Sequence, residues 1–190
     1  MTQVHNPAGQ EQATNGVDVP ALRETIGAIQ QDPTLGDFHF RATNRWLGGA
    51  RNRSTIKGFY GAGKEDDTRT EPYVFENDEP QVLLGEDRAA NPVEYLLHAL
   101  AGCATTTMVM HAAARGIEID SVESEIEGSI DIRGFLGLSN QVPRGYRKIR
   151  LTMRVKSDAD PQTLAALAKS SPVFNTVSQP TPVEINIVAQ

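Results

Sequence analysis

One stretch of the chain restricts its possible folds more than any other: the run from Asn91 to Gly116 has the pattern of a single long apolar helix. Asn91 is a favoured N-cap, Pro92 suits the first helical position, and Glu94 follows the cap by three residues, as in a capping box. Arg115 and Gly116 form a typical helix end. Apolar residues fall on nearly every face in between, which predicts a helix inside the core and at a dimer interface.

This helix contains Cys103, the only cysteine in the 190 residues. A single cysteine can form neither an intrachain disulfide nor a CxxC metal or redox pair. Its neighbours at helical spacing are mostly apolar, and apolar burial raises the pKa of a thiol. The N-terminus of the helix is several turns away, too far for its dipole to act on the thiol. From the residues alone, Cys103 is interpreted as a structural residue, as buried thiols usually are.

Short alternating runs precede the long helix. Glycine turns separate runs at 38–47, 53–60 and 73–84, which predicts a meander of antiparallel strands. The third run should break at Asp78-Glu79-Pro80, because proline disfavours a central ladder position. A short amphipathic helix is expected between Asp18 and Asp32, with Asp18 as its cap. Residues 1–16 are polar and are expected to form a flexible lead.

Two strands, a helix and a last strand are predicted after the long helix. The segments 121–132 and 147–156 alternate cleanly, one with an acidic outer face and the other with a basic one, so they are expected to pair. The connector 133–146 is apolar for a loop, which favours contact with a partner or a place in a binding site. A helix should open at Asp160-Pro161, and residues 182–189 are predicted to form a terminal strand.

The order of these elements predicts an α+β fold, with antiparallel sheets around a long buried core helix. We expect an N-terminal extension with a short helix at 1–36 and one domain at 37–190. The net charge of −6 argues against a nucleic-acid partner. Neither a secretory leader nor a run of 18 apolar residues is visible, so no membrane partner and a cytoplasmic location are expected.

Common catalytic and cofactor motifs are missing from the sequence. It has no GxGxxG after a strand, no P-loop, no HExxH and no GxSxG. The histidines lack the spacing of metal ligands; they are His5, His39, His98 and His111. We therefore expect no cofactor and no metal.

The stretch "NPVEYLLHALAGCATTT", the helix end "RGI" and a late "SPV" resemble the OsmC/Ohr family, the osmotically inducible protein C and organic hydroperoxide resistance proteins. The family pattern is an Asn-Pro-x-Glu helix opening, small residues leading to a cysteine, and a later Cys-Pro-Val. The resemblance extends over about residues 38–188. It implies an intertwined homodimer, with the core helices side by side and active sites at the subunit interface.

The resemblance also implies a thiol chemistry. The cysteine that matches Cys103 attacks the O–O bond of a peroxide and becomes a sulfenic acid. A second cysteine then forms a disulfide, which a dithiol such as a lipoylated protein reduces. An arginine and a glutamate activate the first thiol. The glutamate matches Glu94, and Arg53 (or Arg51) could reach the thiol from another strand.

The sequence departs from the family pattern at one decisive position. Cys-Pro-Val is replaced by Ser171-Pro172-Val173, so the resolving thiol is absent. In addition, "QVLLGEDRAANP", which leads into the long helix, has no arginine at the matching position.

Three interpretations follow, and whether the chain is an enzyme stays open among them. The first is a one-cysteine, thiol-dependent hydroperoxide reductase with an external thiol reductant, in which Cys103, Glu94 and Arg53 (or Arg51) are catalytic. The second is a non-catalytic or ligand-binding homodimer that holds a small apolar ligand. The third is a stress-associated protein with a purely structural cysteine. A substrate pocket would be lined by His98, Thr107, Phe135, Leu136 and Ser171.

Overall fold

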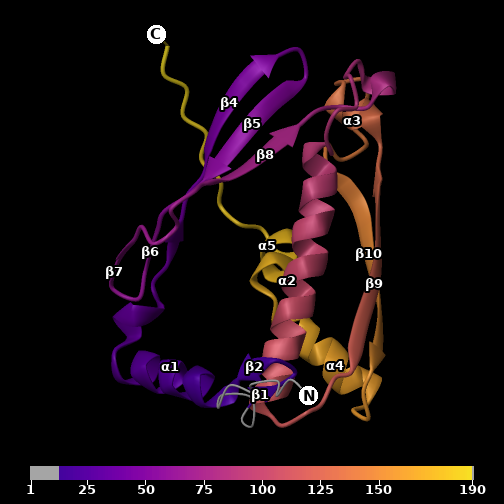
Figure 1. Cartoon of the computed structure of the whole chain (residues 1–190). Helices are drawn as coiled ribbons and strands as arrows, with labels where there is room; N and C mark the ends of the chain where they lie inside the picture. The colour runs from indigo at the N-terminus through magenta and orange to yellow at the C-terminus, as the bar shows by residue number, and fades with distance from the viewer. Residues whose placement is uncertain (1–12, 190) are drawn as a thin grey trace, which may run out of the picture. The chain divides into compact units, whose positions relative to one another are not determined.

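The computed structural model describes residues 13–189, which divide into two compact units (Figure 1). One unit comprises residues 18–96, and the other comprises residues 97–189 together with 13–17. Most of the flexible lead predicted for residues 1–16 lies outside the described residues. The predicted division at residue 36 stays a prediction.

The first unit opens with the predicted helix α1 (Val19–Gln31). The side chain of Asp18 accepts a hydrogen bond from the backbone N–H of Ala21 at 2.9 Å, which confirms it as the N-cap. The helix ends at Asp32, and a short 3₁₀ turn, η2 (Pro33–Gly36), follows it.

Six strands form two antiparallel sheets in this unit. The first sheet has the order β3 (His39–Phe40), β6 (Phe59–Gly61) and β7 (Lys64–Asp66). The second has the order β4 (Thr43–Gly48), β5 (Arg51–Ile56) and β8 (Tyr73–Asn77). The antiparallel arrangement confirms the prediction, but single strands at 38–47 and 53–60 were wrong, because each run is divided between the two sheets.

The division of the second run coincides with Gly58, which lies between β5 and β6. A Cβ there would lie 2.7 Å from a carboxylate oxygen of Asp67 and 3.3 Å from Asp66 O, so a larger residue would displace the Asp67 side chain. The third run breaks after Asn77, as predicted. The residues beyond Pro80 form a 3₁₀ turn, η3 (Gln81–Leu83), rather than more strand.

Helix α2 (Pro92–Ala114) has the predicted start and end. Asn91 Oδ1 accepts from the Glu94 N–H, and Glu94 Oε2 accepts from the Asn91 N–H, both at 2.9 Å, which completes a capping box. At the other end Gly116 has a φ of 69° and the N–H of Ile117 donates to Ala112 O.

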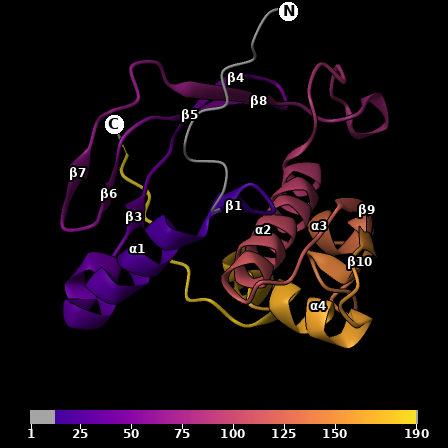
Figure 2. The same cartoon turned by 60° about the horizontal axis from the view of Figure 1, so that its bottom comes forward.

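The second unit packs its core on α2. It contains β9 (Ser121–Ile130), α3 (Ile132–Phe135), β10 (Tyr146–Lys156), α4 (Pro161–Ala168) and α5 (Pro172–Ser178). Met108 and Ala112 of α2 form a buried cluster with Leu164 and Leu167 of α4. Side chains from β9 and β10 pack against this cluster, and α2 lies beside both strands and α4 (Figure 2).

By length and hydropathy alone, α2 is the one helix in the described part of the chain that could cross a membrane. Its residues Leu100, Ala104, Met108 and Ala112 are at most 5% exposed. Because this face packs in the core of its own unit, α2 has the character of a core helix, as predicted.

Strands β9 and β10 pair as predicted. They are antiparallel, with Arg150 opposite Glu127, and Arg154 forms an ion pair with Glu125 at 2.7 Å. The connector between them contains α3, where Phe135 is 72% exposed and Leu136 is 58% exposed within the chain.

The terminal strand predicted at 182–189 was wrong. These residues form no strand, and the side chains of Val183, Ile185 and Ile187 are at least 80% exposed. Alternation defines two faces of an extended segment, but a strand also needs an edge with which to pair. The predicted homodimer stays a prediction.

Residues 13–16 are ordered rather than part of a flexible lead. They belong to a tight turn between β1 (Ala13–Thr14) and β2 (Val17–Asp18), in which Asn15 and Gly16 have positive φ angles of 55° and 76°. Asn15 donates to Ile117 O at 2.9 Å and accepts from the Ile119 N–H at 2.8 Å. This turn is therefore anchored to the segment that follows α2.

Candidate functional site

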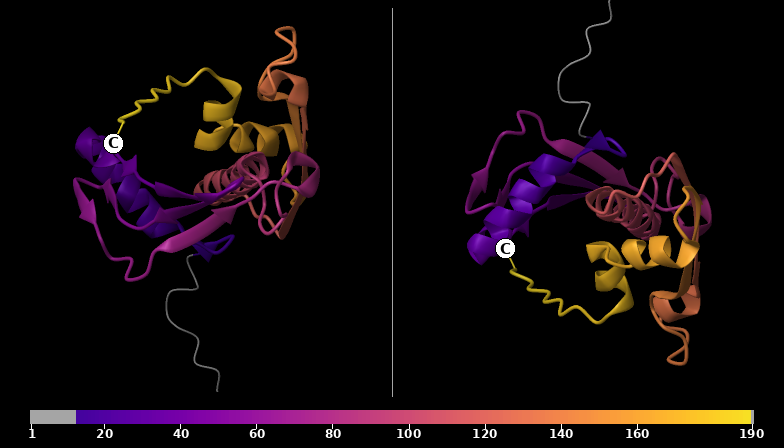
Figure 3. Two further views of the ribbon diagram at one scale, coloured as in Figure 1. Left: turned by 90° about the horizontal axis from the view of Figure 1, so that it is seen from above. Right: turned by 90° about the horizontal axis from the view of Figure 1, so that it is seen from below.

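The candidate site is built where α5 meets the middle of α2. Cys103 is half-buried on α2, and Ser171, the N-cap of α5, is fully buried. Both views in Figure 3 show α4 and α5 beside α2. The Ser171 Oγ accepts from the Phe174 N–H at 3.1 Å, so this hydroxyl is fixed by the first turn of α5.

Three donors surround the thiol of Cys103. They are the hydroxyl of Ser171, the backbone N–H of Val173 and the hydroxyl of Thr107. Burial raises the pKa of the thiol, but these hydrogen bonds outweigh burial, and the pKa of Cys103 is lower than its ordinary value. The site thus favours the thiolate, which is the nucleophilic form.

The sequence-based expectation of a raised pKa was therefore wrong. It considered only neighbours on the same helix, whereas two of the three donors come from residues far along the chain. A pattern for α5 was present: Ser171 followed by Pro172 has the features of an N-cap and a first helical residue. That start predicts N–H groups without helical partners in the first turn, including that of Val173.

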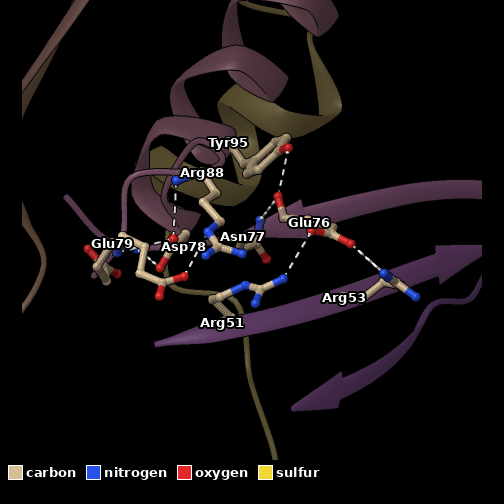
Figure 4. A network of polar contacts seen from close by, with 9 residues as sticks. Arg51, Arg53, Glu76, Asn77, Asp78, Glu79, Arg88 and Tyr95 are labelled. Atoms are coloured by element: carbon tan, nitrogen blue, oxygen red, sulfur yellow. Dashed lines mark hydrogen bonds and ion pairs between the residues drawn. The ribbon is translucent and has the colours of Figure 1, made fainter. Parts of the chain in front are cut away.

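Glu94 and the two candidate arginines are held by other partners. One carboxylate oxygen of Glu94 is used in the capping box. Arg53 donates twice to Glu76 Oε1, from Nε at 3.0 Å and from a terminal nitrogen at 2.5 Å, and Arg51 lies 3.8 Å from Glu76 (Figure 4). The hydrogen bond from Arg53 is the main cause of the lowered pKa of Glu76. Their predicted roles at the thiol stay predictions.

A buried carboxylate that the sequence did not reveal lies beside this network. Asp78 is 1% exposed and accepts from the backbone N–H groups of Glu79, Glu86 and Arg88 at 2.8, 3.2 and 3.1 Å. Burial raises its pKa, but the three donors outweigh burial and the pKa is lowered. The loop is tight, since a Cβ at Gly85 would lie 1.7 Å from Glu79 O. Asp78 therefore organises the loop before α2.

The residues predicted to line a pocket fall into two groups, those that contact the thiol and those that are exposed to solvent. Thr107 and Ser171 both contact the thiol. His98 lies on an exposed part of α2, and Phe135 and Leu136 are exposed around α3. The role of these last three in a pocket stays a prediction.

The pH dependence of alkylation measures the state of the thiol. We expect iodoacetamide to react with Cys103 with a midpoint below the usual thiol value of about 8.5. Ser171→Ala removes one thiolate donor, so it should raise the midpoint and slow the reaction at pH 7 severalfold. Ser170→Ala, which changes the exposed neighbouring residue, is the control. A midpoint unchanged in Ser171→Ala would contradict the assigned hydrogen bond.

The lowered pKa of Cys103 also makes the free energy of unfolding depend on pH in a defined direction. Because the folded pKa lies below the unfolded value, the contribution of Cys103 to the free energy of unfolding is fully present above the unfolded pKa. It is lost as the pH falls through the folded pKa.

Solved structures from several bacteria share this fold. An OsmC-like protein from Mycoplasma pneumoniae has a TM-score of 0.56 and 18% identity, over 73% of this chain and 86% of that chain. An OsmC-like protein of unknown function from Vibrio cholerae has a TM-score of 0.52 and 12% identity, over 73% and 92%. An osmotic stress induced and detoxification response protein from Psychrobacter arcticus has a TM-score of 0.51 and 17% identity, over 71% and 85%.

The sequence comparisons locate the family relationship in the half of the chain that contains Cys103 and Ser171. Among curated protein sequences, none matches the chain significantly. The family profile described as OsmC-like protein matches residues 85–186. This match covers more than half of the chain, includes α2 and α5, and agrees with the fold, and the chain therefore belongs to the OsmC-like protein family.

Proposed function

We propose that this OsmC-like protein is a one-cysteine, thiol-dependent hydroperoxide reductase that acts through Cys103. The observation that supports this most directly is the set of three donors around the thiol, which lowers its pKa. A thiol kept only for packing needs no such donors, since apolar burial suffices for it. Membership of a family that includes hydroperoxide resistance proteins makes a peroxide the natural oxidant.

The proposed reaction has three balanced steps. The Cys103 thiolate attacks the terminal oxygen of a hydroperoxide ROOH, the O–O bond breaks, and the alkoxide takes a proton to leave as ROH. The sulfenic acid condenses with an external thiol, forming a mixed disulfide and releasing water. A second external thiol attacks this disulfide and regenerates Cys103, so two thiols are oxidised to one disulfide for each ROOH reduced.

Ser171 has a different role here from that of a resolving cysteine. Its hydroxyl donates to the thiolate and cannot form a disulfide. The roles of Glu94 and Arg53 (or Arg51) in activating the thiol stay predictions drawn from the family resemblance. The reductant is a small thiol or dithiol from outside the chain.

Mass spectrometry after one equivalent of cumene hydroperoxide tests the proposal. We expect one oxygen atom to be added at Cys103 within the mixing time, and dimedone to trap it as the sulfenic acid. One cumyl alcohol per chain should appear together with this oxidation, and addition of a dithiol to a sample without dimedone should restore the original mass. Cys103→Ser is the control and should consume no peroxide. An unmodified Cys103 in the wild-type chain would contradict the proposal.

A second candidate function is favoured by the exposed apolar side chains near α3. Phe135, Leu136 and Leu138 are at least 58% exposed, which suits a homodimer that holds an apolar ligand without catalysis. Native mass spectrometry with a panel of fatty acids separates the two functions. A retained fatty acid, together with an unreactive Cys103, would favour the binding protein over the reductase.

A further inference from the structure

One face of the β4–β5–β8 sheet brings like charges together. Arg45 on β4 is directly opposite Arg53 on β5, and Arg53 is opposite Glu76 on β8. Thr43 is opposite Thr55 two residues along the same strands. Because side chains alternate along a strand, both pairs project from the same face of the sheet.

The charges on this face are not balanced. Glu76 is the acceptor for Arg53 and lies within 3.8 Å of Arg51, so a single carboxylate serves two guanidinium groups. Arg45 makes no hydrogen bond or ion pair with any residue that the structure describes. Like charges directly opposite each other destabilise an antiparallel pair. The arrangement of Arg45 and Arg53 is therefore unfavourable unless another anion is present.

A hollow of about 360 Å³ lies over these residues. It is lined by residues Thr43, Asn44, Arg45, Arg53 and Thr55. The amide of Asn44 is bonded to Asn52 and Ser54 on the other face of the sheet, so guanidinium and hydroxyl side chains are the polar groups on this face. This lining contains neither a carboxylate nor a large apolar side chain. Such a composition disfavours a cation and an apolar ligand, and it suits an oxyanion that accepts several hydrogen bonds.

We propose that this face binds a phosphate monoester dianion between Arg45 and Arg53. Arg51 is near Glu76 and Asp78, and Arg53 shares Glu76 with it, whereas Arg45 has no carboxylate partner among the described residues, so an oxyanion between Arg45 and Arg53 would offset the like charges of this pair. The forks of Arg45 and Arg53 can each donate to phosphate oxygens, and the hydroxyls of Thr43 and Thr55 can donate to others. The hollow exceeds the size of a phosphate group and leaves room for a small organic group on the ester.

Calorimetric titration of the full chain with phenyl phosphate, at pH 8 and fixed ionic strength, tests this site. We expect saturable binding that Arg45→Gln weakens by about tenfold, the loss of one charge-assisted contact. Arg23→Gln makes the same charge change on α1, where the side chain is exposed, and should bind like the wild type. Cys103→Ser should also bind like the wild type, which keeps this test separate from that of the reductase.

Thermal unfolding gives a second readout that a purely structural role for Arg45 would not produce. Without ligand, Arg45→Gln should unfold at the same temperature as the wild type or higher, because it removes the like-charge pair. With phenyl phosphate, only the wild type should gain stability. The proposal would be overturned if the binding of phenyl phosphate did not saturate or if Arg23→Gln weakened it as much as Arg45→Gln. It would also be overturned if acetate bound equally tightly.

Discussion

The variant Ser171→Cys is expected to form a disulfide with Cys103 when one equivalent of hydroperoxide is added. The Ser171 side chain donates a hydrogen bond to the Cys103 sulfur, so a thiol at this position starts within reach of it. The sulfenic acid should condense with this thiol and release water, so that the chain loses two hydrogen atoms instead of gaining one oxygen.

The outcome is read from thiol counts and intact mass. After peroxide treatment, the denatured Ser171→Cys chain should show no free thiol, and a dithiol should restore two. Ser170→Cys is the matched control, because residue 170 is exposed and adjacent in the chain but makes no contact with the thiol. An intrachain disulfide in both variants, or in neither, would contradict the geometry assigned to Ser171.

Asp78→Ala is expected to produce the largest loss of stability. The substitution leaves three backbone N–H groups of the loop before α2 without their acceptor, and the loss of three hydrogen bonds to a carboxylate destabilises the fold. We expect the midpoint of thermal unfolding to fall by roughly 5–10 °C at pH 7. Asp67→Ala removes the same charge from an exposed position and should leave the midpoint nearly unchanged.

The stabilising contribution of the Asp78 carboxylate should depend on pH in a defined direction. The folded pKa of Asp78 is lowered, so its stabilising contribution is present above the ordinary aspartate pKa of about 3.9 and is lost as the pH falls through the folded value. The difference in midpoint between wild type and Asp78→Ala should therefore shrink in acid. A difference that stayed constant from pH 7 to pH 3 would mean that packing, rather than the carboxylate, holds the loop.

Capping residues and strict alternation made much of the fold predictable. Asn91, Glu94 and Gly116 set the limits of α2, and Asp18 and Asp160 set the starts of α1 and α4. The charge patterns of the segments 121–132 and 147–156 identified β9 and β10 as partners. These features depend on neighbours in sequence or on one pairing partner, so local patterns are sufficient to reveal them.

The failures share a different cause. The run at 38–47 was divided because its two halves pair with different strands, and residues 182–189 found no strand with which to pair. The candidate site was hidden in the same way, because Cys103 meets Ser171 and Val173 only through the packing of α5 on α2. Contacts between distant segments are set by tertiary structure, which local propensity does not specify.

The opposite charges of β9 and β10 restrict the symmetry with which copies of this chain could associate through sheet edges. A two-fold axis would place β9 beside β9 of another copy and set Glu123, Glu125 and Glu127 against their own equivalents. The same axis beside β10 would oppose Arg150 and Arg154 with themselves. Electrostatic repulsion therefore disfavours both isologous edge pairings of this two-stranded sheet, whereas β9 beside β10 of another copy would bring opposite charges together.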